Sequence, residues 1–528
     1  MPSNKVCRIG NGYYLYSRES YWDPKEKKSK QRHSTYVGKC DKDGNLLEPV
    51  KKRFDAVHSA FPVGPLSIFY ATAKVLSLTE HIQEVMEIDP QMASHILCLV
   101  MNQLVSKRPV DKIPAWVLKS PLVQWETLDP KGLTSYALGT ALSNICYISS
   151  DTGKQDHGLW LQHEMTKIWR EGTKEPAYCY YDVTKQAYYG TNCFYGEPGY
   201  IPGGTNKQVL GFGLVTSRDN HFPVLCRPIR GSKHDTVTVQ DTVNTLKAWG
   251  FEHLTMTMDR GMVSKENVDF VLRSGFDIIG MVPETNKKAW EYVTRWSPKG
   301  LAKPQFVVTR PSGKTVYARV WTAPLFNGTK MKVAVVEDPE RKMEEKLGRD
   351  QALKELQGTP SPQRIKELRR EIGELAVPSP GRRGFIVNED LVEENSKGDG
   401  RFLMFSTDMS LDAEDMLTTY YQKDTIEKAF RTVKGEIKLA PIRYRREDRI
   451  DAYSTIIYLA YLIWRKAELK LREKYPSMTL TQALATVEDV SWIRFGSGKS
   501  IRDWTTNLTK DQEEILDTVG ATKVLPVS

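Results

Sequence analysis

The sequence has 528 residues, which is too many for one hydrophobic core, so two to four domains are expected. Hydrophobic residues make up 40% of the chain and charged residues 27%, values that suit globular packing and argue against a disordered chain. The formal net charge of +10 suits a polyanionic partner such as nucleic acid.

Seven cysteines are scattered along the chain and form no C-x-x-C pair. This pattern argues against a disulfide framework and a zinc cluster, and it favours a reducing compartment. The N-terminal residues lack the apolar core of a signal peptide. The longest apolar run, residues 456 to 464, is too short to span a bilayer. We therefore expect a soluble, cytoplasmic protein.

The N-terminal third is predicted to contain a β-rich module followed by helices. Residues 1 to 53 alternate aromatic and β-branched runs with charged turns, and they carry 13 Lys and Arg against 6 Asp and Glu. Residues 54 to 175 carry apolar positions at helical spacing, as in LSIFYATAKVLSLTEHIQEVM. Helices beside a basic module suggest a DNA-binding region, and a plain helical scaffold is the alternative.

From residue 176 the pattern changes to alternating strands and helices. Strands are predicted at residues 179–184, 207–217, 222–231, 254–259 and 276–282. Helices are predicted at residues 236–249 and 264–275, the second with a serine cap. The order β-β-β-α-β-α-β describes an antiparallel start followed by α/β crossovers.

Residues 283 to 400 interrupt this pattern with the strand-like runs FVVTR, TVYARVWT and KMKVAVVE, followed by two charged helical stretches around the breaker GTPSP. We expect a helical pair or an extended arm there. Strands at residues 381–388 and 401–407 then return to the core, and one or two helices and a long apolar helix follow. The polar residues 476 to 528 give no clear prediction.

Two aspartates occupy notable positions in the predicted sheet. Asp182 lies in the middle of the first strand, in CYYDVTKQAYYG, although strands are poor in aspartate. Asp259 ends the fourth strand, which this element order places beside the first. Two carboxylates a few ångströms apart repel unless a proton or a cation lies between them, and hard divalent ions favour carboxylate oxygens. Asp182 is therefore explained either by a bound cation or by an ordinary turn.

A third carboxylate is expected from the helix in YYQKDTIEKAFRTVKGEIK. Four apolar residues at helical spacing predict its buried stripe: Ile426, Phe430, Val433 and Ile437. Glu427 lies about 100° round from Ile426, at the edge of that stripe. Tyr420, Glu427 and Lys434 are seven residues apart and are expected to stack in one line, with Lys423 on the same side. A solvated polar face would show the same pattern.

These motifs together resemble the DDE transposases of insertion-sequence family four. The family signature Y-x2-[R/K]-x3-E-x6-K is matched by Tyr420, Lys423, Glu427 and Lys434, with lysine in place of the usual arginine. That replacement keeps the charge but loses the bidentate geometry toward phosphate. YYDVT and MDRGMVSKEN resemble the family's two aspartate segments, and IRGSKHDTVTV resembles its glycine-rich turn. The resemblance covers about residues 176 to 465.

The resemblance implies a multidomain α/β protein with a ribonuclease H-like mixed sheet and helices, interrupted by a large β-rich and helical insertion. The expected parts are a basic β-rich module (1–53), a helical and DNA-binding region (54–175), the first part of the ribonuclease H-like core (176–282), an insertion subdomain (283–400), the second part of the core with the glutamate helix (401–475) and a C-terminal region (476–528).

The resemblance also implies a function, that of a DNA transposase of an insertion sequence. Such an enzyme performs metal-dependent cleavage at the ends of the element and transfers the strands to target DNA. Asp182, Asp259 and Glu427 would be the catalytic residues and the ligands of Mg²⁺, or of Mn²⁺. The DNA-binding residues would be Tyr420, Lys423, Lys434, Arg431 and Arg260.

The implied partners are double-stranded DNA, as terminal inverted repeats and as target, and a second copy of the chain in an active homodimer at the nucleoid of a prokaryotic cell. Some relatives stack a flipped base on an aromatic side chain of the insertion. Trp290, Trp296 and Trp321 are candidates for that role, and core packing is the alternative. Two other functions stay open: a transposase-derived DNA-binding protein without catalysis, and a related carboxylate nuclease that cuts but does not join strands.

Overall fold

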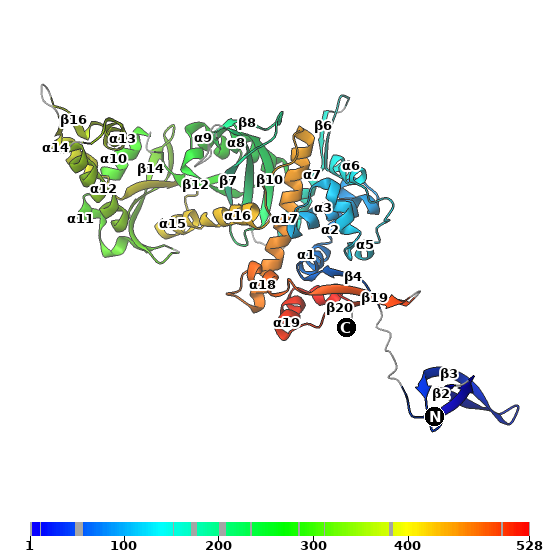
Figure 1. The fold of residues 1–528 in the computed structure, drawn as a ribbon. Coiled ribbons are helices and arrows are strands. Elements are labelled where there is room, and N and C mark those ends of the chain that lie inside the picture. Colours follow the sequence, from blue (N-terminus) through cyan, green and yellow to red (C-terminus); the bar gives the residue numbers. More distant parts are fainter. Residues whose placement is uncertain are drawn as a thin grey trace. The chain divides into compact units, whose positions relative to one another are not determined.

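The computed structural model describes residues 3–10, 12–47, 56–151, 153–170, 177–199, 207–232, 235–283, 286–310, 312–358, 360–379, 384–497 and 500–526. The chain divides into two compact units (Figure 1). The first unit is Met1–Ala60 with Ile493–Trp504, and the second is Phe61–Trp492 with Thr505–Ser528.

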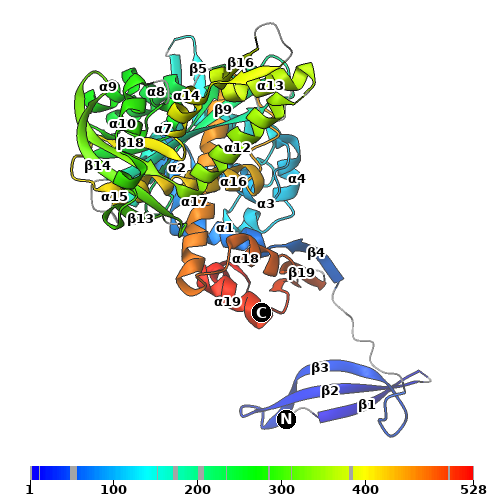
Figure 2. The ribbon, with the colours of Figure 1, turned by 90° about the vertical axis from the view of Figure 1, so that its left-hand side faces the viewer.

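The first unit contains the β structure that the N-terminal sequence predicts. Three antiparallel strands form one sheet in sequence order (Figure 2): β1 (Ser3–Ile9), β2 (Gly12–Asp23) and β3 (Lys28–Cys40). Tyr14, Tyr16 and Tyr36 pack their rings against one another across β2 and β3. A second sheet has the order β20-β19-β4 and consists of β4 (Ala56–Pro62), β19 (Ser491–Ser497) and β20 (Ser500–Thr505).

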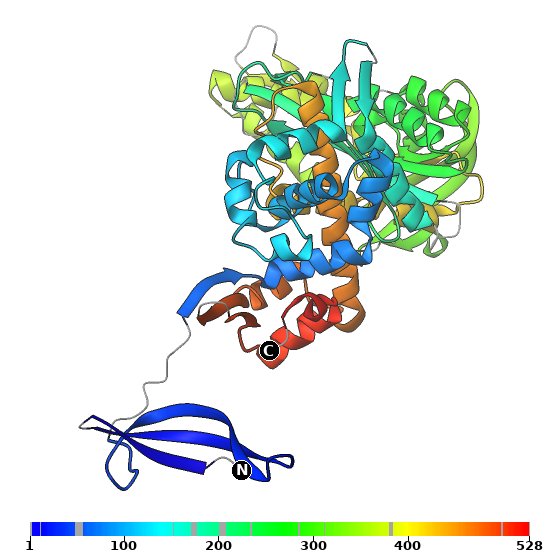
Figure 3. The same cartoon turned by 90° about the vertical axis from the view of Figure 1, so that its right-hand side faces the viewer.

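The second unit begins with a helical region built around one buried helix, α17 (Glu447–Lys474). The helices of residues 64 to 170 lie along one side of α17 in Figure 3 and share a hydrophobic core with it, and β10 of the sheet described below also contacts α17. They are α1 (Gly64–Val75), α2 (Leu78–Met86), α3 (Pro90–Val105), α4 (Ile113–Val117), α5 (Leu122–Trp125), α6 (Ser135–Ile145) and α7 (His157–Arg170). A hairpin of β5 (Cys146–Ser149) and β6 (Gly153–Asp156) precedes α7.

The apolar run at residues 456 to 464 lies inside α17, and all of its side chains are buried in this core. Among the described helices, none is both long and apolar enough to cross a membrane. The C-terminal residues, which carry no clear pattern, form α18 (Leu480–Thr486) and α19 (Lys510–Thr518), which pack on α17.

A ten-stranded mixed sheet forms the centre of the second unit, and its first part follows the predicted elements closely. These are β7 (Ala177–Ala187), β9 (Lys207–Ser217), β10 (Pro223–Arg230), α8 (Asp235–Ala248), β11 (Leu254–Met258), α9 (Lys265–Arg273) and β12 (Asp277–Met281). The short β8 (Glu197–Gly199) pairs with β9. The strand order is β10-β9-β7-β11-β12, so the first and fourth predicted strands are neighbours, as expected. Ser264 caps α9 by accepting a hydrogen bond from the Asn267 amide.

Three strands of the insertion extend this same sheet, whereas its two short C-terminal strands pair only with each other. The strand predicted at residues 381–388 therefore does not return to the central sheet, because its described part pairs with residues 376–378. The order continues from β12 through β18 (Arg401–Ser406), β15 (Thr329–Glu337), β14 (Thr315–Leu325) and β13 (Val307–Thr309). The charged stretches form the expected helical pair, α12 (Pro339–Gln357) and α13 (Pro362–Ile372). Smaller elements complete the insertion: α10 (Lys287–Thr294), α11 (Pro298–Leu301), β16 (Ala376–Pro378), β17 (Phe385–Val387) and α14 (Glu389–Ser396).

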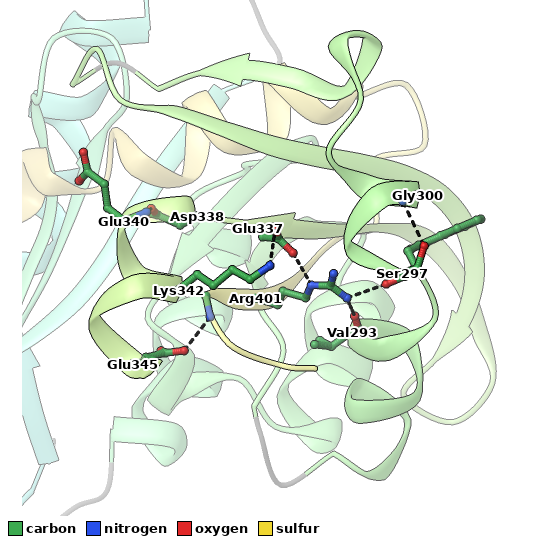
Figure 4. A network of polar contacts seen from close by, with 11 residues as sticks. Val293, Ser297, Gly300, Glu337, Asp338, Glu340, Lys342, Glu345 and Arg401 are labelled. Carbon is green, nitrogen blue, oxygen red and sulfur yellow. Dashed lines mark hydrogen bonds and ion pairs between the residues drawn. The ribbon is translucent and has the colours of Figure 1, made fainter. Parts of the chain in front are cut away.

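A buried ion pair joins the insertion to the sheet (Figure 4). Arg401 of β18 stands opposite Glu337 of β15, and its Nε donates to Glu337 Oε2 at 2.6 Å. Arg401 Nη1 also donates to the carbonyl oxygens of Val293 and Trp296. Lys342 Nζ in the first turns of α12 lies 3.2 Å from Glu337 Oε1. Since removing one partner of a buried pair leaves the other charge unpaired, these contacts fix the start of α12 on the sheet.

Asp156, at the end of β6, gives a testable prediction about pH. Burial and the charge of Asp451 raise the pKa of Asp156 to about 6. A carboxyl group with a raised pKa binds a proton on folding, so its contribution to stability falls as the pH rises from about 4 to 6. Asp156→Asn keeps the oxygen that accepts the Leu159 amide and removes the charge. We expect this change to raise Tm at pH 7.5 by a few degrees, since the shift is worth up to about 3 kcal/mol.

The measurement is differential scanning calorimetry of both proteins at pH 7.5 and pH 4.5. At the lower pH the gain should shrink, because the wild-type carboxyl is then largely protonated. An equal gain at both pH values, or none at pH 7.5, would contradict the assigned charge state.

Candidate active site

A polar cavity of about 130 Å³ lies where β7 and β11 meet the helix that carries Glu427. All three predicted carboxylates line it. The complete lining is Tyr180, Tyr181, Asp182, Thr257, Met258, Asp259, Lys423, Ile426 and Glu427. The cavity therefore brings together carboxylates that are up to 245 positions apart in the sequence, from Asp182 to Glu427.

The register of the parallel strands places Asp182 and Asp259 side by side. Tyr181 of β7 pairs with Met258 of β11, so the next residues, Asp182 and Asp259, stand level on strands about 4.8 Å apart. Asp259 keeps extended backbone angles (φ −70°, ψ 152°) although the strand ends one residue earlier. Asp182 lies within β7, opposite Leu214 of β9, and its Oδ1 accepts a hydrogen bond from the Val183 amide at 2.7 Å.

The alternation of side chains along the two strands aims both aspartates at the same face of the sheet. Tyr181 and Met258 belong to the hydrophobic core on the face covered by α8 and α9. Tyr180, two residues before Asp182, belongs to the core formed with the helical region and α17. Because successive side chains in a strand point to opposite faces, Asp182 and Asp259 share the second face. In the motifs YYD and TMTMD, Tyr181 and Met258 therefore point into the core covered by α8 and α9. The aspartates that follow them point to the other face of the sheet.

Asp259 is exposed and forms an ion pair with Lys423, whose Nζ lies 2.6 Å from Asp259 Oδ1. Partial burial alone would raise the pKa of Asp259. The hydrogen bond from Lys423 and the positive charge of Lys423 outweigh that effect, so the pKa lies below its ordinary value. Asp259 also precedes the short 3-10 helix Arg260–Met262. The carboxylate is thus held in its charged form by a cation from the chain itself.

The segment that carries Lys423 corrects one sequence prediction. Tyr420 and Glu427 were expected to stack along one helix, but the helix is interrupted. Tyr420 lies near the end of α15 (Ala413–Tyr421), and a turn at Gln422 and Lys423 separates it from α16 (Asp424–Gly435). In this turn the Lys423 amide donates to the Tyr420 carbonyl, so the hydrogen-bond spacing tightens. Asp424 and Glu427 then occupy the first turn of α16, where the helix dipole favours negative charge.

Tyr420 is buried, with 2% of its surface exposed, so its ring is not presented to solvent. Its hydroxyl lies 3.2 Å from Lys423 Nζ and accepts a hydrogen bond from it. Lys423 Nζ also lies 4.8 Å from the centre of the Tyr420 ring. Tyr420 therefore positions Lys423 beside Asp259, and its ring is not available for stacking on DNA.

Glu427 is exposed at the edge of the cavity, on a helix whose packing matches the prediction. Four residues of α16 and of the turn after it are buried as expected: Ile426, Phe430, Val433 and Ile437. They belong to the core shared with α17, and α16 packs against β7 and β9. This stripe holds α16 against the sheet, so Glu427 lies opposite the two aspartates.

The other predicted DNA-binding residues surround the cavity without lining it. Lys434, Arg431 and Arg260 are exposed. Burial lowers the pKa of Lys434, and the negative charge of Asp182 opposes that effect. Lys434 therefore lies close enough to Asp182 for their charges to interact. Arg260 directly follows Asp259 in the chain, and Arg431 lies one turn beyond Glu427 on α16.

The oxygen atoms of the cavity suit a hard divalent cation, although they are not yet gathered into a ligand cluster. In the described part of the chain, no three His, Cys, Asp or Glu side chains are grouped so that they could hold a metal ion as they stand. The three carboxylates nonetheless line one small cavity, and the buried Thr257 Oγ1 beside them has no hydrogen-bond partner among the described residues. Lys423 would have to release Asp259 before a metal ion could bind there.

Sequence reasoning missed Thr257 and the ion pair of Lys423. Thr257 could have been suspected from its position two residues before Asp259, since alternate residues share a face. No signal in the sequence indicated that Lys423 faces Asp259 instead of a phosphate group. Of the three tryptophans considered for base stacking, Trp296 and Trp321 pack against each other at the edge of the core, and Trp290 is exposed.

Comparisons with known proteins identify the class of this chain. The sequence profile of the transposase DDE domain family matches residues 194–463, which is just over half of the chain and includes Asp259 and Glu427. The chain belongs to the transposase DDE domain family. The match begins after Asp182, so it does not cover the first of the three carboxylates.

Two further comparisons add little to the family assignment. No curated protein matches the chain in sequence. A solved structure described as a cryo-EM structure of the piggyBac transposase synaptic complex with hairpin DNA is similar over 88% of this chain and 86% of that one, with 11% identity and a TM-score of 0.38. A TM-score this low supports no inference about this chain.

The ion pair gives a prediction for the pKa of Asp259. Lys423→Met keeps most of the side-chain length but removes the cation, so the effect of burial is no longer outweighed. We expect the pKa of Asp259 to rise from below its ordinary value to at least that value. The measurement is a carbon-13 NMR titration of protein labelled at aspartate carboxyl carbons, with the Asp259 signal assigned by Asp259→Asn.

Lys428→Met, on the exposed side of α16, is the matched control and should leave the Asp259 signal unchanged. An unchanged pKa in the Lys423→Met protein would show that the ion pair does not form in solution.

Proposed function

We propose that this protein is a DNA transposase that cleaves the ends of a mobile element and joins them to target DNA. The observation that carries the proposal is the convergence of Asp182, Asp259 and Glu427 on one cavity in a chain of the transposase DDE domain family. Three acidic side chains from two strands and a helix suit phosphoryl transfer at a phosphodiester, where catalysis depends on positioning and on charge stabilisation.

In this proposal the three carboxylates hold two divalent cations, Mg²⁺ or Mn²⁺. When bound, such ions activate a water molecule or a 3′-hydroxyl and stabilise the leaving oxygen. Asp182, Asp259 and Glu427 all line the cavity, so these three carboxylates would hold the ions. Lys423, freed from Asp259, then lies beside the position of the DNA backbone.

Cationic side chains around the cavity are proposed to orient the DNA. Lys434 lies near Asp182, and Arg431 and Arg260 are exposed nearby. Contacts to phosphate groups fix the register of a protein on DNA but read no sequence. We therefore assign Lys434, Arg431, Arg260 and the released Lys423 to holding the backbone on either side of the cut.

The finer classification rests on the motif spacing and the strand order. Tyr420, Lys423, Glu427 and Lys434 keep the spacing of insertion-sequence family four, and the order β10-β9-β7-β11-β12 supports a ribonuclease H-like core. On this basis we infer a prokaryotic insertion-sequence enzyme that acts as a homodimer on double-stranded DNA. The basic residues 1 to 53 and the helical residues 54 to 175 are proposed to recognise the terminal repeats.

Glu427→Gln tests the chemistry. The change keeps the size of the side chain and removes the charge that would bind a metal ion, while the buried stripe still holds α16 in place. We expect Mg²⁺-dependent cleavage and strand transfer on labelled end DNA to fall by at least 100-fold, or about 3 kcal/mol in activation free energy, with DNA binding retained.

Glu436→Gln, an exposed change just beyond α16, is the control and should cleave normally. Near-normal cleavage by the Glu427→Gln protein would exclude Glu427 as a ligand. A wild-type protein that binds end DNA but never cleaves it would indicate a DNA-binding relative without catalysis. Cleavage without joining would indicate a nuclease.

Lys434→Ala tests the grip on DNA. Loss of one phosphate contact should lower the salt dependence of binding, so that the slope of log K against log salt falls by about 1 and the affinity at 0.1 M salt falls roughly tenfold. The measurement is fluorescence anisotropy of end DNA at several salt concentrations. Lys428→Ala is the matched control. Lys428 also lies on α16, but on another side of the helix, where its charge acts on His221. Equal slopes for Lys434→Ala and wild type would remove Lys434 from the DNA contact.

A further inference from the structure

A second cavity, of about 240 Å³, lies beside the segment that follows α16, and the catalytic proposal makes no use of it. Its walls come from the end of α3, from α6 and α17, and from residues 441 to 444. Three cationic side chains line it: Lys107, Arg108 and Arg443. Among the described residues of its lining, Asp111 is the single carboxylate, and Asp111 is exposed and pairs with Lys112 at 3.5 Å.

Arg108 is held in place by contacts that include no carboxylate among the described residues. Asn102 fixes the backbone of Arg108 by donating to its carbonyl and accepting from its amide, at 3.0 and 2.9 Å. The Arg108 guanidinium lies 5.0 Å from the centre of the Trp116 ring. Its Nη1 is buried and has no hydrogen-bond partner among the described residues. A buried guanidinium N–H without an acceptor is costly, so this geometry favours a ligand with an acceptor oxygen.

Lys107 links the helical region to the segment after the glutamate helix. Its Nζ donates to the backbone carbonyls of Lys438 and Leu439, the second at 2.8 Å, and Tyr453 donates to the same Leu439 carbonyl. Burial, followed by the positive charges of Arg443 and Lys438, lowers the pKa of Lys107 to about 7. Burial makes the charged form of Lys107 costly and the neighbouring like charges add to that cost, and a bound anion would relieve it.

We propose that this cavity binds a phosphate group, and that the backbone of the DNA substrate supplies it. The identification of the ligand as phosphate follows from the convergence of one ammonium and two guanidinium groups, since guanidinium groups bind phosphate oxygens in pairs. The identification of the source as DNA rests on the function proposed above.

The position of the cavity relative to α16 suits a contact beyond the cut site. Glu427 and Gly435 are eight residues apart on α16, a rise of about 12 Å, and the cavity follows within the next residues of the chain. The first lining residue of the cavity after α16, Pro441, comes six residues beyond Gly435. A phosphate bound there would hold the helical region and the segment after α16 on the same strand that enters the active site.

Calorimetric titration of the full chain with inorganic phosphate, at constant ionic strength in chloride, tests the site itself. Arg443 is exposed, so Arg443→Ala should fold normally. We expect its dissociation constant for phosphate to rise at least tenfold, with a smaller rise for Arg443→Lys. Arg445→Ala, in the same segment but outside the cavity lining, should bind phosphate like wild type. Absence of phosphate binding to the wild-type chain, or equal binding by Arg443→Ala, would overturn the proposal.

The salt dependence of binding to end DNA tests the source of the phosphate. For Arg443→Ala the slope of log K against log salt should fall by about 1. Arg273→Ala is the control, because Arg273 is the last residue of α9, just before β12 begins, at the opposite end of the strands from Asp259. If phosphate binding is lost but the DNA slope is unchanged, the site stands and its ligand is a free phosphate compound. The Glu427→Gln change leaves this cavity intact, so the two proposals can fail separately. If Glu427→Gln loses cleavage while Arg443→Ala keeps the wild-type salt slope and the wild-type phosphate titration, this inference alone is refuted.

Discussion

Two carboxylates standing level on neighbouring parallel strands set the main electrostatic constraint in this protein. The register of β7 and β11 leaves Asp182 and Asp259 about one strand spacing apart on the same face. Such a pair is unfavourable without a neighbouring cation. In the described structure Lys423 supplies that cation to Asp259, and the charge of Lys434 acts on Asp182. The two strands place the aspartates side by side, and the turn before α16 and α16 itself place the two lysines beside them.

The same constraint gives Lys423, four residues before Glu427, its place in the proposed mechanism. Without a metal ion, Lys423 neutralises Asp259 and is held in place by the hydroxyl and ring of Tyr420. In the proposed mechanism, metal ions bound to the carboxylates would take the place of the lysine and leave it available to a phosphate group. A lysine suits this exchange because its single ammonium group sits on a flexible stem, whereas an arginine fork is more rigid. The interruption between α15 and α16 gives Lys423 its position.

Much of the fold and the choice of the acidic residues followed from the sequence, because both depend on local patterns. Alternation defined β7 and β11, and helical spacing gave the buried stripe Ile426, Phe430, Val433 and Ile437.

The features that were missed depend on contacts between distant residues. Nothing local to residues 307–337 shows that their strands join the central sheet, since that depends on pairing with β18. At Gln422 the chain makes a tighter turn in place of one helical turn. The apolar residues of α16 keep their helical spacing after it, so hydrophobic periodicity could not reveal the break. Lys423 contacts Asp259 across 164 positions, beyond the reach of any spacing rule.

The central claim is that Asp182, Asp259 and Glu427 together bind divalent cations. The most direct measurement is a crystal structure of the full chain soaked in Mn²⁺, with anomalous scattering data to locate the metal. The account predicts manganese peaks between the three carboxylates, about 4 Å apart if both sites fill, with Lys423 moved away from Asp259. Manganese bound elsewhere, or a Lys423–Asp259 ion pair that persists at saturating metal, would contradict it.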